Sequence, residues 1–153
     1  MNNAHGGNNA RDRAVRWCVD PSLPDGAPTD GPVADVLARN QEFYDAHEAR
    51  DLERMAAVWE VSDRVVCIHP GWPIMRTYAH VIESWRRILG GPGRLQFILS
   101  NVAVAIDGDI AWVTLEENLL GGPTPVVVAA TNLFARIDGT WQLVVHHGSP
   151  VGH

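Results

Sequence analysis

The sequence predicts a single α+β domain of about 120 residues, in which a curved antiparallel sheet wraps around N-terminal helices and encloses one internal pocket. Helical periodicity dominates the first half of the folded region, and strand-like segments joined by turns or a short loop follow it. Helices followed by a run of antiparallel strands are typical of α+β domains, whereas α/β domains alternate the two kinds of element.

Three segments have the apolar spacing of amphipathic helices. The first begins near Val33, with Asp30 as N-cap and Pro32 in its first turn. Asp51 is placed to cap a second, short helix, and a third helix begins at Thr77 and ends at a glycine-rich stretch. The apolar stripe of the first helix contains Val33, Val36, Leu37, Phe43, Tyr44 and His47.

The remaining patterns predict strands. A short β-branched run at residues 64–68 stops at His69-Pro70-Gly71. After the third helix, turn residues such as Asp107-Gly108-Asp109 separate longer apolar runs, which is typical of hairpins. The strands of this meander are predicted at residues 95–106, 110–120, 126–137 and 141–147.

The first 32 residues differ in composition from the rest, with many glycines, prolines and asparagines. This composition is typical of a flexible extension, so we expect the folded domain to span residues 33–151. Within the extension, residues 14–19 are apolar enough to dock on the domain.

The bulk properties exclude several classes of protein. A net charge of -6 argues against nucleic acid or an anionic membrane as a partner, because both bind a basic surface. There is no run of 18 apolar residues and no signal-peptide core, so we expect neither a membrane span nor export. Cys18 and Cys67 fit neither a disulfide framework nor a zinc signature, and we expect a cytoplasmic protein.

Glu117 is the first candidate for a catalytic group. Ala111, Val113, Leu115 and Glu117 share one face of the second meander strand, and Glu117 is the ionisable group in that apolar row. We therefore expect a desolvated carboxyl with a raised pKa. The alternative is that Glu117 lies near the rim and pairs with a cation such as Arg76.

Histidines provide further candidates. His69 ends the short strand beside a rigid turn, a position that aims a side chain into a cavity, although it could instead cap the loop. His146 and His147 point to opposite faces of the last strand, and the phase with Trp141 favours His147 as the residue that faces the pocket. No spacing among these residues matches a known metal-ligand motif, so we expect no metal.

Aromatic side chains are placed to form a pocket wall. Trp72 follows His69 in the loop, and Trp85 lies on the third helix. Together with Phe134 and Tyr44 they suit a flat hydrophobic ligand, although packing alone would also explain them.

Several motifs occur in an order that we recognise. They are residues 42–52 (EFYDAHEARDL), His69-Pro70-Gly71, Ser84-Trp85, residues 111–114 (AWVT) and residues 146–150 (HHGSP). This arrangement resembles the SnoaL-like group of the nuclear transport factor two and ketosteroid isomerase superfamily. The resemblance covers residues 33–151 and implies a cone-shaped half-barrel, usually a homodimer, with a pocket between the concave sheet and the helices.

The resemblance also bears on the reaction. Ketosteroid isomerase has an aspartate base followed by proline after its first strand, and His69-Pro70 occupies the matching place. Its oxyanion-holding acid falls near Asn132, and its helix-one tyrosine falls at or beside Tyr44. The isomerase residues are therefore not reproduced, and steroid isomerisation is not expected. SnoaL-like members include polyketide cyclases, dehydratases and cofactor-independent oxygenases.

Two functions follow as hypotheses. The first is a cofactor-free enzyme acting on a hydrophobic polycyclic, aromatic polyketide-like molecule, with His69 and Glu117 as acid and base and Asn132 or Arg76 holding an oxyanion. Dehydration, cyclisation and isomerisation each need only proton movement beside a carbonyl, and cofactor-free oxygenation is a variant. The second is a non-catalytic ligand-binding or dimerisation module, in which side chains would fill the cavity.

Overall fold

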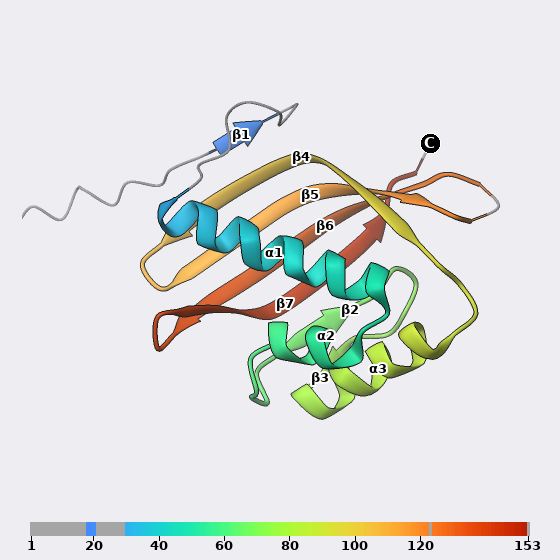
Figure 1. Cartoon of the computed structure of the whole chain (residues 1–153), viewed down its shortest axis with the longest axis horizontal. Coiled ribbons are helices and arrows are strands. Elements are labelled where there is room, and N and C mark those ends of the chain that lie inside the picture. Colours follow the sequence, from blue (N-terminus) through green and yellow to red (C-terminus); the bar gives the residue numbers. More distant parts are fainter. Residues whose placement is uncertain (1–17, 21–29, 123, 153) are drawn as a thin grey trace, which may run out of the picture.

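The computed structural model describes residues 18–20, 30–122 and 124–152 (Figure 1). The predicted extension at residues 1–32 therefore lies mostly outside the described residues. Of the apolar patch at residues 14–19, only the last two residues are described, within the short strand β1 (Cys18–Asp20). This strand pairs with the sheet at Val104, Ala103 and Val102.

The helices form where the sequence predicts them. Helix α1 spans Gly31–Ala49, α2 spans Leu52–Val58 and α3 spans Tyr78–Gly90. Asp51 caps α2 as expected, because its Oδ1 accepts a hydrogen bond of 3.0 Å from the backbone N–H of Arg54. Asp30 occupies the N-cap position of α1, but its side chain makes no capping hydrogen bond. Pro32 supports the first turn, where its missing N–H has no helical acceptor.

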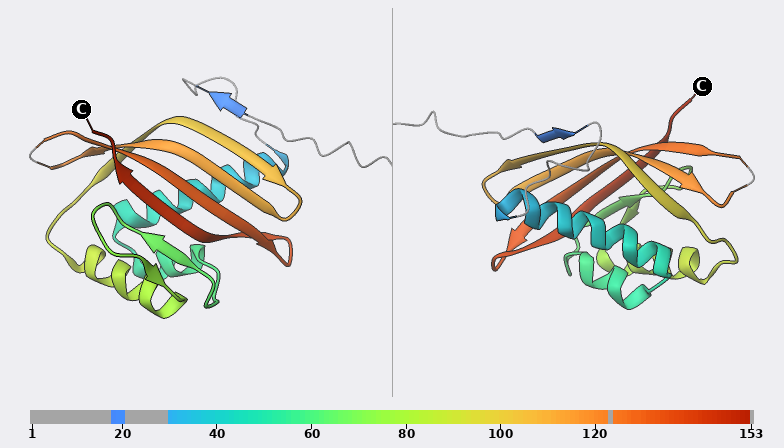
Figure 2. Two further views of the ribbon diagram at one scale, coloured as in Figure 1. Left: turned by 180° about the vertical axis from the view of Figure 1, so that it is seen from behind. Right: turned by 45° about the horizontal axis from the view of Figure 1, so that its top comes forward.

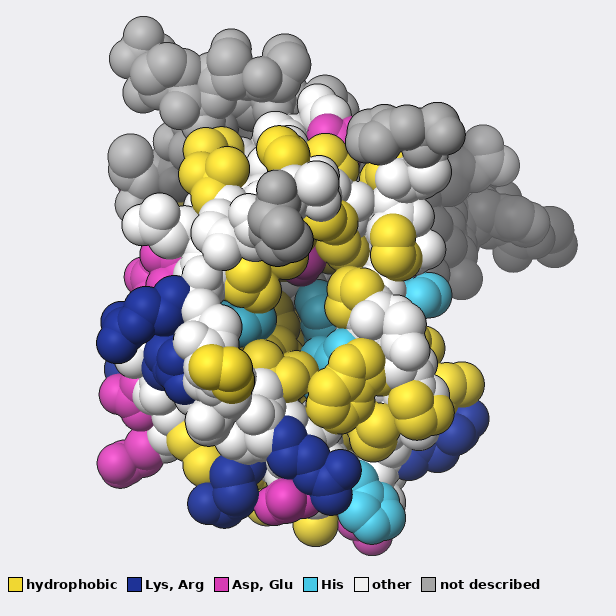
Figure 3. Space-filling model, turned by 90° about the vertical axis from the view of Figure 1, so that its right-hand side faces the viewer, with side chains coloured by type: hydrophobic (Ala, Val, Ile, Leu, Met, Phe, Trp, Pro, Cys, Tyr) yellow, Lys and Arg dark blue, Asp and Glu magenta, His cyan; other side chains and the backbone are white. Residues whose placement is uncertain are grey.

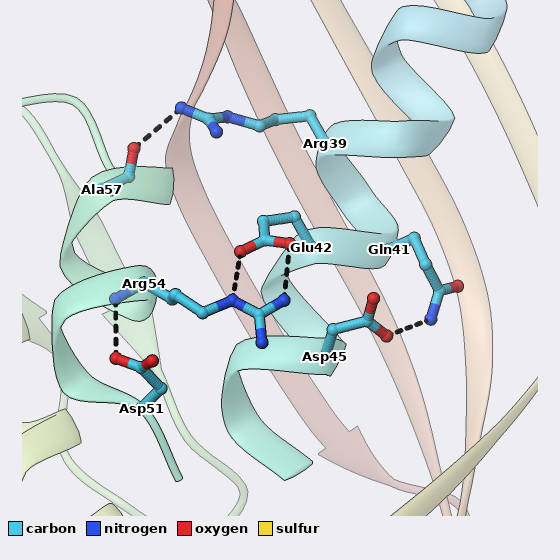
Figure 4. Close-up of polar contacts among 7 residues, drawn as sticks. All are labelled: Arg39, Gln41, Glu42, Asp45, Asp51, Arg54 and Ala57. Carbon is cyan, nitrogen blue, oxygen red and sulfur yellow. Dashed lines mark hydrogen bonds and ion pairs between the residues drawn. The ribbon is translucent and has the colours of Figure 1, made fainter. Parts of the chain in front are cut away.

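Hydrogen bonds and an ion pair join α1 to α2 (Figure 4). The guanidinium of Arg54 donates from Nε and from one terminal nitrogen to the two oxygens of Glu42, each at 2.8 Å. Arg39 donates to the backbone oxygen of Ala57 at the end of α2. The left-handed backbone of Arg50, with φ of 57°, ends α1 and reverses the chain into this pair of helices.

One sheet contains all seven strands that the structure describes, in the order β1-β4-β5-β6-β7-β2-β3. Strands β4 (Gln96–Asp107), β5 (Ile110–Leu120), β6 (Val126–Ile137) and β7 (Thr140–Pro150) form the predicted antiparallel meander. Strand β2 (Val66–Ile68) pairs in parallel with β7, and β3 (Met75–Arg76) pairs antiparallel with β2. The parallel pair is a difference from the wholly antiparallel sheet that the sequence predicts.

The sheet is curved, and its helices lie on the concave side (Figures 1 and 2). Register shifts occur in β4 between Ser100 and Ala103, and where β6 meets β7 beside Leu133 and Phe134. Such bulges bend a strand and increase its twist, which lets the sheet wrap around α1. The opposite face of the sheet is left uncovered by helices in the described part of the chain.

The core fills the space between the helices and the concave face. Phe43 lies at its centre, with its ring 5.0 Å from Tyr44, 5.3 Å from Trp85 and 4.9 Å from the imidazole of His146. Trp59 and Trp141 are buried in the same core. No helix in the described residues is both long enough and apolar enough to cross a membrane.

Candidate functional site

A tight turn places His69 and Trp72 together. The backbone N–H of Trp72 donates to the carbonyl oxygen of His69 at 2.9 Å, and Pro70 and Gly71 occupy the two central positions. Gly71 has φ of 78°, which favours glycine at the third position of a type II turn. The Trp72 ring consequently lies 5.3 Å from that of His69, while 38% of Trp72 remains exposed.

Gly148 lets this turn approach the sheet closely. A Cβ at position 148 would lie 3.1 Å from Pro70 Cγ and 3.1 Å from Val128 Cγ1. These contacts are tighter than ordinary van der Waals packing, so a larger residue would push the turn away. Gly148 on β7 therefore allows the turn that follows His69 to pack closely against the sheet.

The His69 imidazole is buried and has two polar neighbours. Its Nε2 lies 2.8 Å from Ser84 Oγ on α3, and both of its ring nitrogens lie 3.7 Å from Cys67 Sγ on β2. Burial lowers the pKa of His69 to about 4, because the imidazolium form loses its hydration. The side chain is thus an unprotonated base at neutral pH.

Three histidines surround the Trp85 ring. Its centroid lies 4.7 Å from that of His69, 5.1 Å from that of His47 and 6.4 Å from that of His146. Burial, followed by the neighbouring imidazoles, lowers the pKa of His47 to about 4 and that of His146 to about 3. All three imidazoles are therefore neutral at pH 7.

Glu117 is the buried carboxyl of this region, as the strand phase predicts. Its Oε1 accepts a hydrogen bond of 2.8 Å from the Tyr44 hydroxyl on α1. Burial raises the pKa of Glu117 to about 7, although the Tyr44 hydrogen bond lowers it in part. Both its neutral and its ionised forms are consequently populated near neutral pH. Its hydrogen-bond partner is Tyr44 and not Arg76, so the rim-pairing alternative is wrong.

A chain of hydrogen bonds connects Glu117 to His146. Asn132 Nδ2 donates to the Tyr44 hydroxyl at 3.2 Å and to Asn40 Oδ1 at 2.8 Å. Asn132 Oδ1 lies 2.6 Å from His146 Nδ1. All five side chains are buried, and their hydrogen bonds link α1, β5, β6 and β7.

Two predicted site residues lie elsewhere. His147 is exposed on the outer face of β7, and His146 faces inward, which reverses the expectation from strand phase. The reason is the bulge: Leu133 pairs with Val145 while Phe134 pairs with Leu143, so Val144 is an extra residue that shifts the alternation. Arg76 is exposed on the edge strand β3.

The remaining predicted residues are brought together. Trp85 is buried beside the histidines, Trp72 is partly exposed beside His69, and Phe134 is buried in the same hydrophobic core. Figure 3 shows a hollow on one face of the molecule, with hydrophobic side chains around it and histidine side chains inside it. No group of three or more His, Cys, Asp or Glu side chains in the described residues is spaced to hold a metal ion.

The sequence profile of the SnoaL-like domain family matches residues 36–152. This chain belongs to the SnoaL-like domain family. The family and its fold are those of small-molecule-binding domains and of isomerase-type or dehydratase-type domains.

Two solved structures are similar to this chain in both sequence and fold. A Streptomyces avermitilis protein proposed to be a dehydratase of the NTF2-like family is 37% identical, with a TM-score of 0.73 over 78% of this chain and 96% of the other. A Thiobacillus denitrificans protein proposed to be a calcium/calmodulin-dependent protein kinase type II association domain is 34% identical, with a TM-score of 0.71 over 76% of this chain and 94% of the other.

The curated relative is the F-box protein SKIP8 of Arabidopsis thaliana. It is 34% identical over 116 residues, which cover 74% of this chain and 48% of SKIP8. This chain therefore spans about half the length of that relative.

Sequence reasoning missed three polar members of this SnoaL-like site: Asn40, Ser84 and Cys67. Asn40 lies within the apolar stripe of α1 and Ser84 lies beside that of α3, and both are buried. A polar residue within or next to an apolar stripe was the signal that could have identified them. Cys67 shares the strand face of His69, so its contact with the imidazole follows from the period of two.

Proposed function

We propose that this SnoaL-like protein is a cofactor-independent acid–base enzyme. The proposed substrate is an uncharged, hydrophobic polycyclic molecule of aromatic polyketide type, and the reaction is a dehydration, cyclisation or isomerisation in secondary metabolism. The observation that supports it is a carboxyl with a pKa of about 7 in the same buried polar region as neutral imidazoles, in a molecule with a surface hollow that hydrophobic side chains surround.

The proposed chemistry is a proton transfer beside a carbonyl group. Neutral His69 takes a proton from carbon or oxygen, and protonated Glu117 donates one to the developing oxyanion or leaving hydroxyl. Asn132 is not available as an oxyanion donor, because both hydrogens of its Nδ2 are used by Asn40 and Tyr44. The neutral form of Glu117 therefore takes the place that the sequence analysis gave to Asn132 or Arg76.

The charges favour a neutral substrate. The 12 lysine and arginine residues of the chain are all arginine. In the described part of the chain, no arginine is fully buried. Those with hydrogen bonds bind backbone carbonyl groups or carboxylates outside the site, as Arg54 binds Glu42. A substrate carboxylate or phosphate in the hollow would thus meet Glu117 without a compensating cation.

A solvent-exchange experiment tests the proposal. The protein is incubated in D2O with neutral polycyclic ketones and phenols, and deuterium at the carbon next to the carbonyl is measured by mass spectrometry. We expect exchange that depends on the protein and is lost in His69→Gln, and weaker exchange for carboxylate-bearing analogues of the same ring system. Dehydration is read from water loss and oxygenation from oxygen consumption. Binding of a neutral ligand without exchange or conversion would reject the enzyme.

A binding or association module is the second candidate function. One observation favours it: a 34% identical protein is proposed to be an association domain. In that case His69 and Glu117 are structural. Their substitution would then lower the melting temperature and leave the binding of partners by the folded protein unchanged.

We also propose that two copies associate through the outer face of the sheet. This face carries half-buried Trp112, Leu133 and Val145 in one cross-strand row, and Ile98 is 56% exposed beyond it. Val127 also lies on this face. Its neighbours Val126 and Val128 face the helices, because they pair with the inner residues Leu119 and Glu117. Sedimentation should show a dimer at micromolar concentration that Ile98→Arg weakens, and a wild-type monomer would contradict this.

A further inference from the structure

The hydrogen bonds of Ser84 define which nitrogen of His69 carries the proton. Ser84 Oγ donates its single proton to the carbonyl oxygen of Val81, 2.7 Å away, and that oxygen can only accept. The 2.8 Å contact between Ser84 Oγ and His69 Nε2 therefore needs a proton from the imidazole. Neutral His69 is thus protonated at Nε2, and its Nδ1 has a free lone pair.

The hydrogen bonds of the buried network define the proton of His146 in the same way. When Glu117 is ionised it can only accept, so the Tyr44 hydroxyl donates to it and accepts from the Asn132 amide nitrogen. Asn132 Oδ1 then faces His146 Nδ1 at 2.6 Å, and this oxygen requires a donor. Neutral His146 is consequently protonated at Nδ1, with the lone pair on Nε2.

We propose that His69 and His146 carry their protons on opposite ring nitrogens, with Ser84 and Asn132 as the positioning residues, so that His69 Nδ1 is the basic atom of the site. The proton positions follow from the network alone, whereas the role of Nδ1 in turnover rests on the proposed function.

The imidazoles of His69 and His146 have different hydrogen-bond partners and therefore different roles. Their ring centroids are 6.4 Å apart. His69 contacts Ser84 and His146 contacts Asn132, so each imidazole has its own hydrogen-bond partner. Cys67 lies at 3.7 Å from both nitrogens of His69, so it does not favour either tautomer. Ser84 is the neighbour that distinguishes them.

Long-range ¹H–¹⁵N correlation NMR of the full chain at pH 8, where Glu117 is ionised, measures the tautomers without substrate. His69→Gln and His146→Gln assign the two imidazoles by loss of signal. We expect the His69 pattern of an Nε2-protonated ring and the His146 pattern of an Nδ1-protonated ring. The same tautomer at both histidines, or Nδ1 protonation at His69, would overturn the proposal whatever the protein catalyses.

Substitutions then test the positioning residues. Ser84→Ala keeps a good helix former on α3 and should lower the ratio of Nε2-protonated to Nδ1-protonated His69 by about fivefold, the net contribution of one hydrogen bond. Ser84→Thr keeps the hydroxyl and should restore the ratio. Cys67→Ala is the matched control, which removes an equally buried neighbour of His69 and should leave its tautomer unchanged. An unchanged ratio in Ser84→Ala would overturn the role of Ser84.

Turnover provides a separate test once a substrate is found. Ser84→Ala should lower kcat by at most about fivefold with little change in KM, because the fraction of His69 with a free Nδ1 cannot fall by more than the tautomer ratio does, while the ligand contacts remain. Asn132→Asp retains an acceptor for His146 and should keep its Nδ1 proton. Opposite tautomers without any turnover would reject the proposed enzyme and leave the assignment of the protons intact.

Discussion

Glu116 and Glu117 are neighbours on β5, yet the first faces away from the helices and the second faces them. Glu116 is half-buried on the outer face, where its Oε2 accepts hydrogen bonds from Asn101 at 2.7 Å and from Ser100 at 3.3 Å. Glu117 is 4% exposed and accepts from the Tyr44 hydroxyl. The difference shows that strand alternation and burial, and not residue type, turn one of two carboxyls into a candidate acid.

The comparison extends to the surroundings of each carboxyl. Glu116 lies beside the β4 bulge, where Asn101 has φ of 51° and donates a hydrogen bond from its side-chain amide to the carboxylate. Glu117 lies near Cys67, whose thiol pKa is raised by burial and by the charge of Glu117. An ionised Glu117 therefore raises the pKa of a buried neighbour, which is expected where little water screens the charge.

The largest difference between the two carboxyls should appear in turnover. Glu117→Gln keeps the shape of the side chain and removes its proton, so we expect a loss of roughly a hundredfold or more, typical of a positioned acid or base. Glu116→Gln is the matched control and should change turnover by less than about twofold, since surface changes away from a site have small effects. Equal losses in the two variants would remove the catalytic assignment of Glu117.

A double variant measures whether Glu117 and His69 act as one unit. His69→Gln alone should also lower turnover by roughly a hundredfold. The double variant His69→Gln/Glu117→Gln should be no slower than the slower single variant, because groups that act together are non-additive. Melting temperatures of the same three proteins provide the control: a large decrease in melting temperature with unchanged turnover would instead indicate a structural pair.

Falling pH should lower the free energy of unfolding because of the histidines buried on the inner side of the sheet. The pKa values of His47, His69 and His146 are lowered to about 4, 4 and 3, so below pH 6.5 the unfolded chain binds protons that the folded chain does not. Stability is lost as pH falls from 6.5 towards 4, by roughly 1.4 kcal/mol per pH unit for each net proton. Urea unfolding at several pH values measures this slope.

Glu117 acts in the opposite sense over part of that range. Its raised pKa means that the folded chain holds a proton between pH 4.5 and 7 which the unfolded chain releases. Glu117→Gln should therefore make the acid slope steeper, and His69→Gln should make it shallower by one proton. A slope that neither substitution alters would contradict the burial of both groups in the folded protein.

The smallest effect should come from Tyr44→Phe. Loss of its hydroxyl removes the hydrogen bond that lowers the pKa of Glu117, so the pKa should rise further. The alkaline side of the pH profile of turnover, where Glu117 loses the proton that it donates, should shift to higher pH, with little change in the maximum. The same substitution leaves Glu116 untouched, so a profile that does not shift would mean that Tyr44 does not control the carboxyl.

The sequence predicted those features that depend on local period. Two-residue alternation on β5 correctly placed Glu117 inside, and the 3.6-residue period correctly placed Tyr44 and Trp85 on buried helix faces. The same reasoning failed for His147, because the bulge at Val144 shifts the alternation and depends on pairing with β6. The roles of Asn40 and Ser84 were also missed, since their partners come from β6 and from the turn after β2.

The parallel pairing of β2 with β7 has a consequence for folding. Ile68 pairs with His147 and Cys67 with His146, across about half of the chain length, and β2 otherwise pairs only with the two residues of β3 among the described strands. Such remote contacts close large loops and form slowly. During synthesis, the strand that carries Cys67 and leads into His69 must therefore wait for residues 140–150 before it gains its long partner. Misfolding should concentrate in this interval, when the edge of β2 that later pairs with β7 is still unpaired.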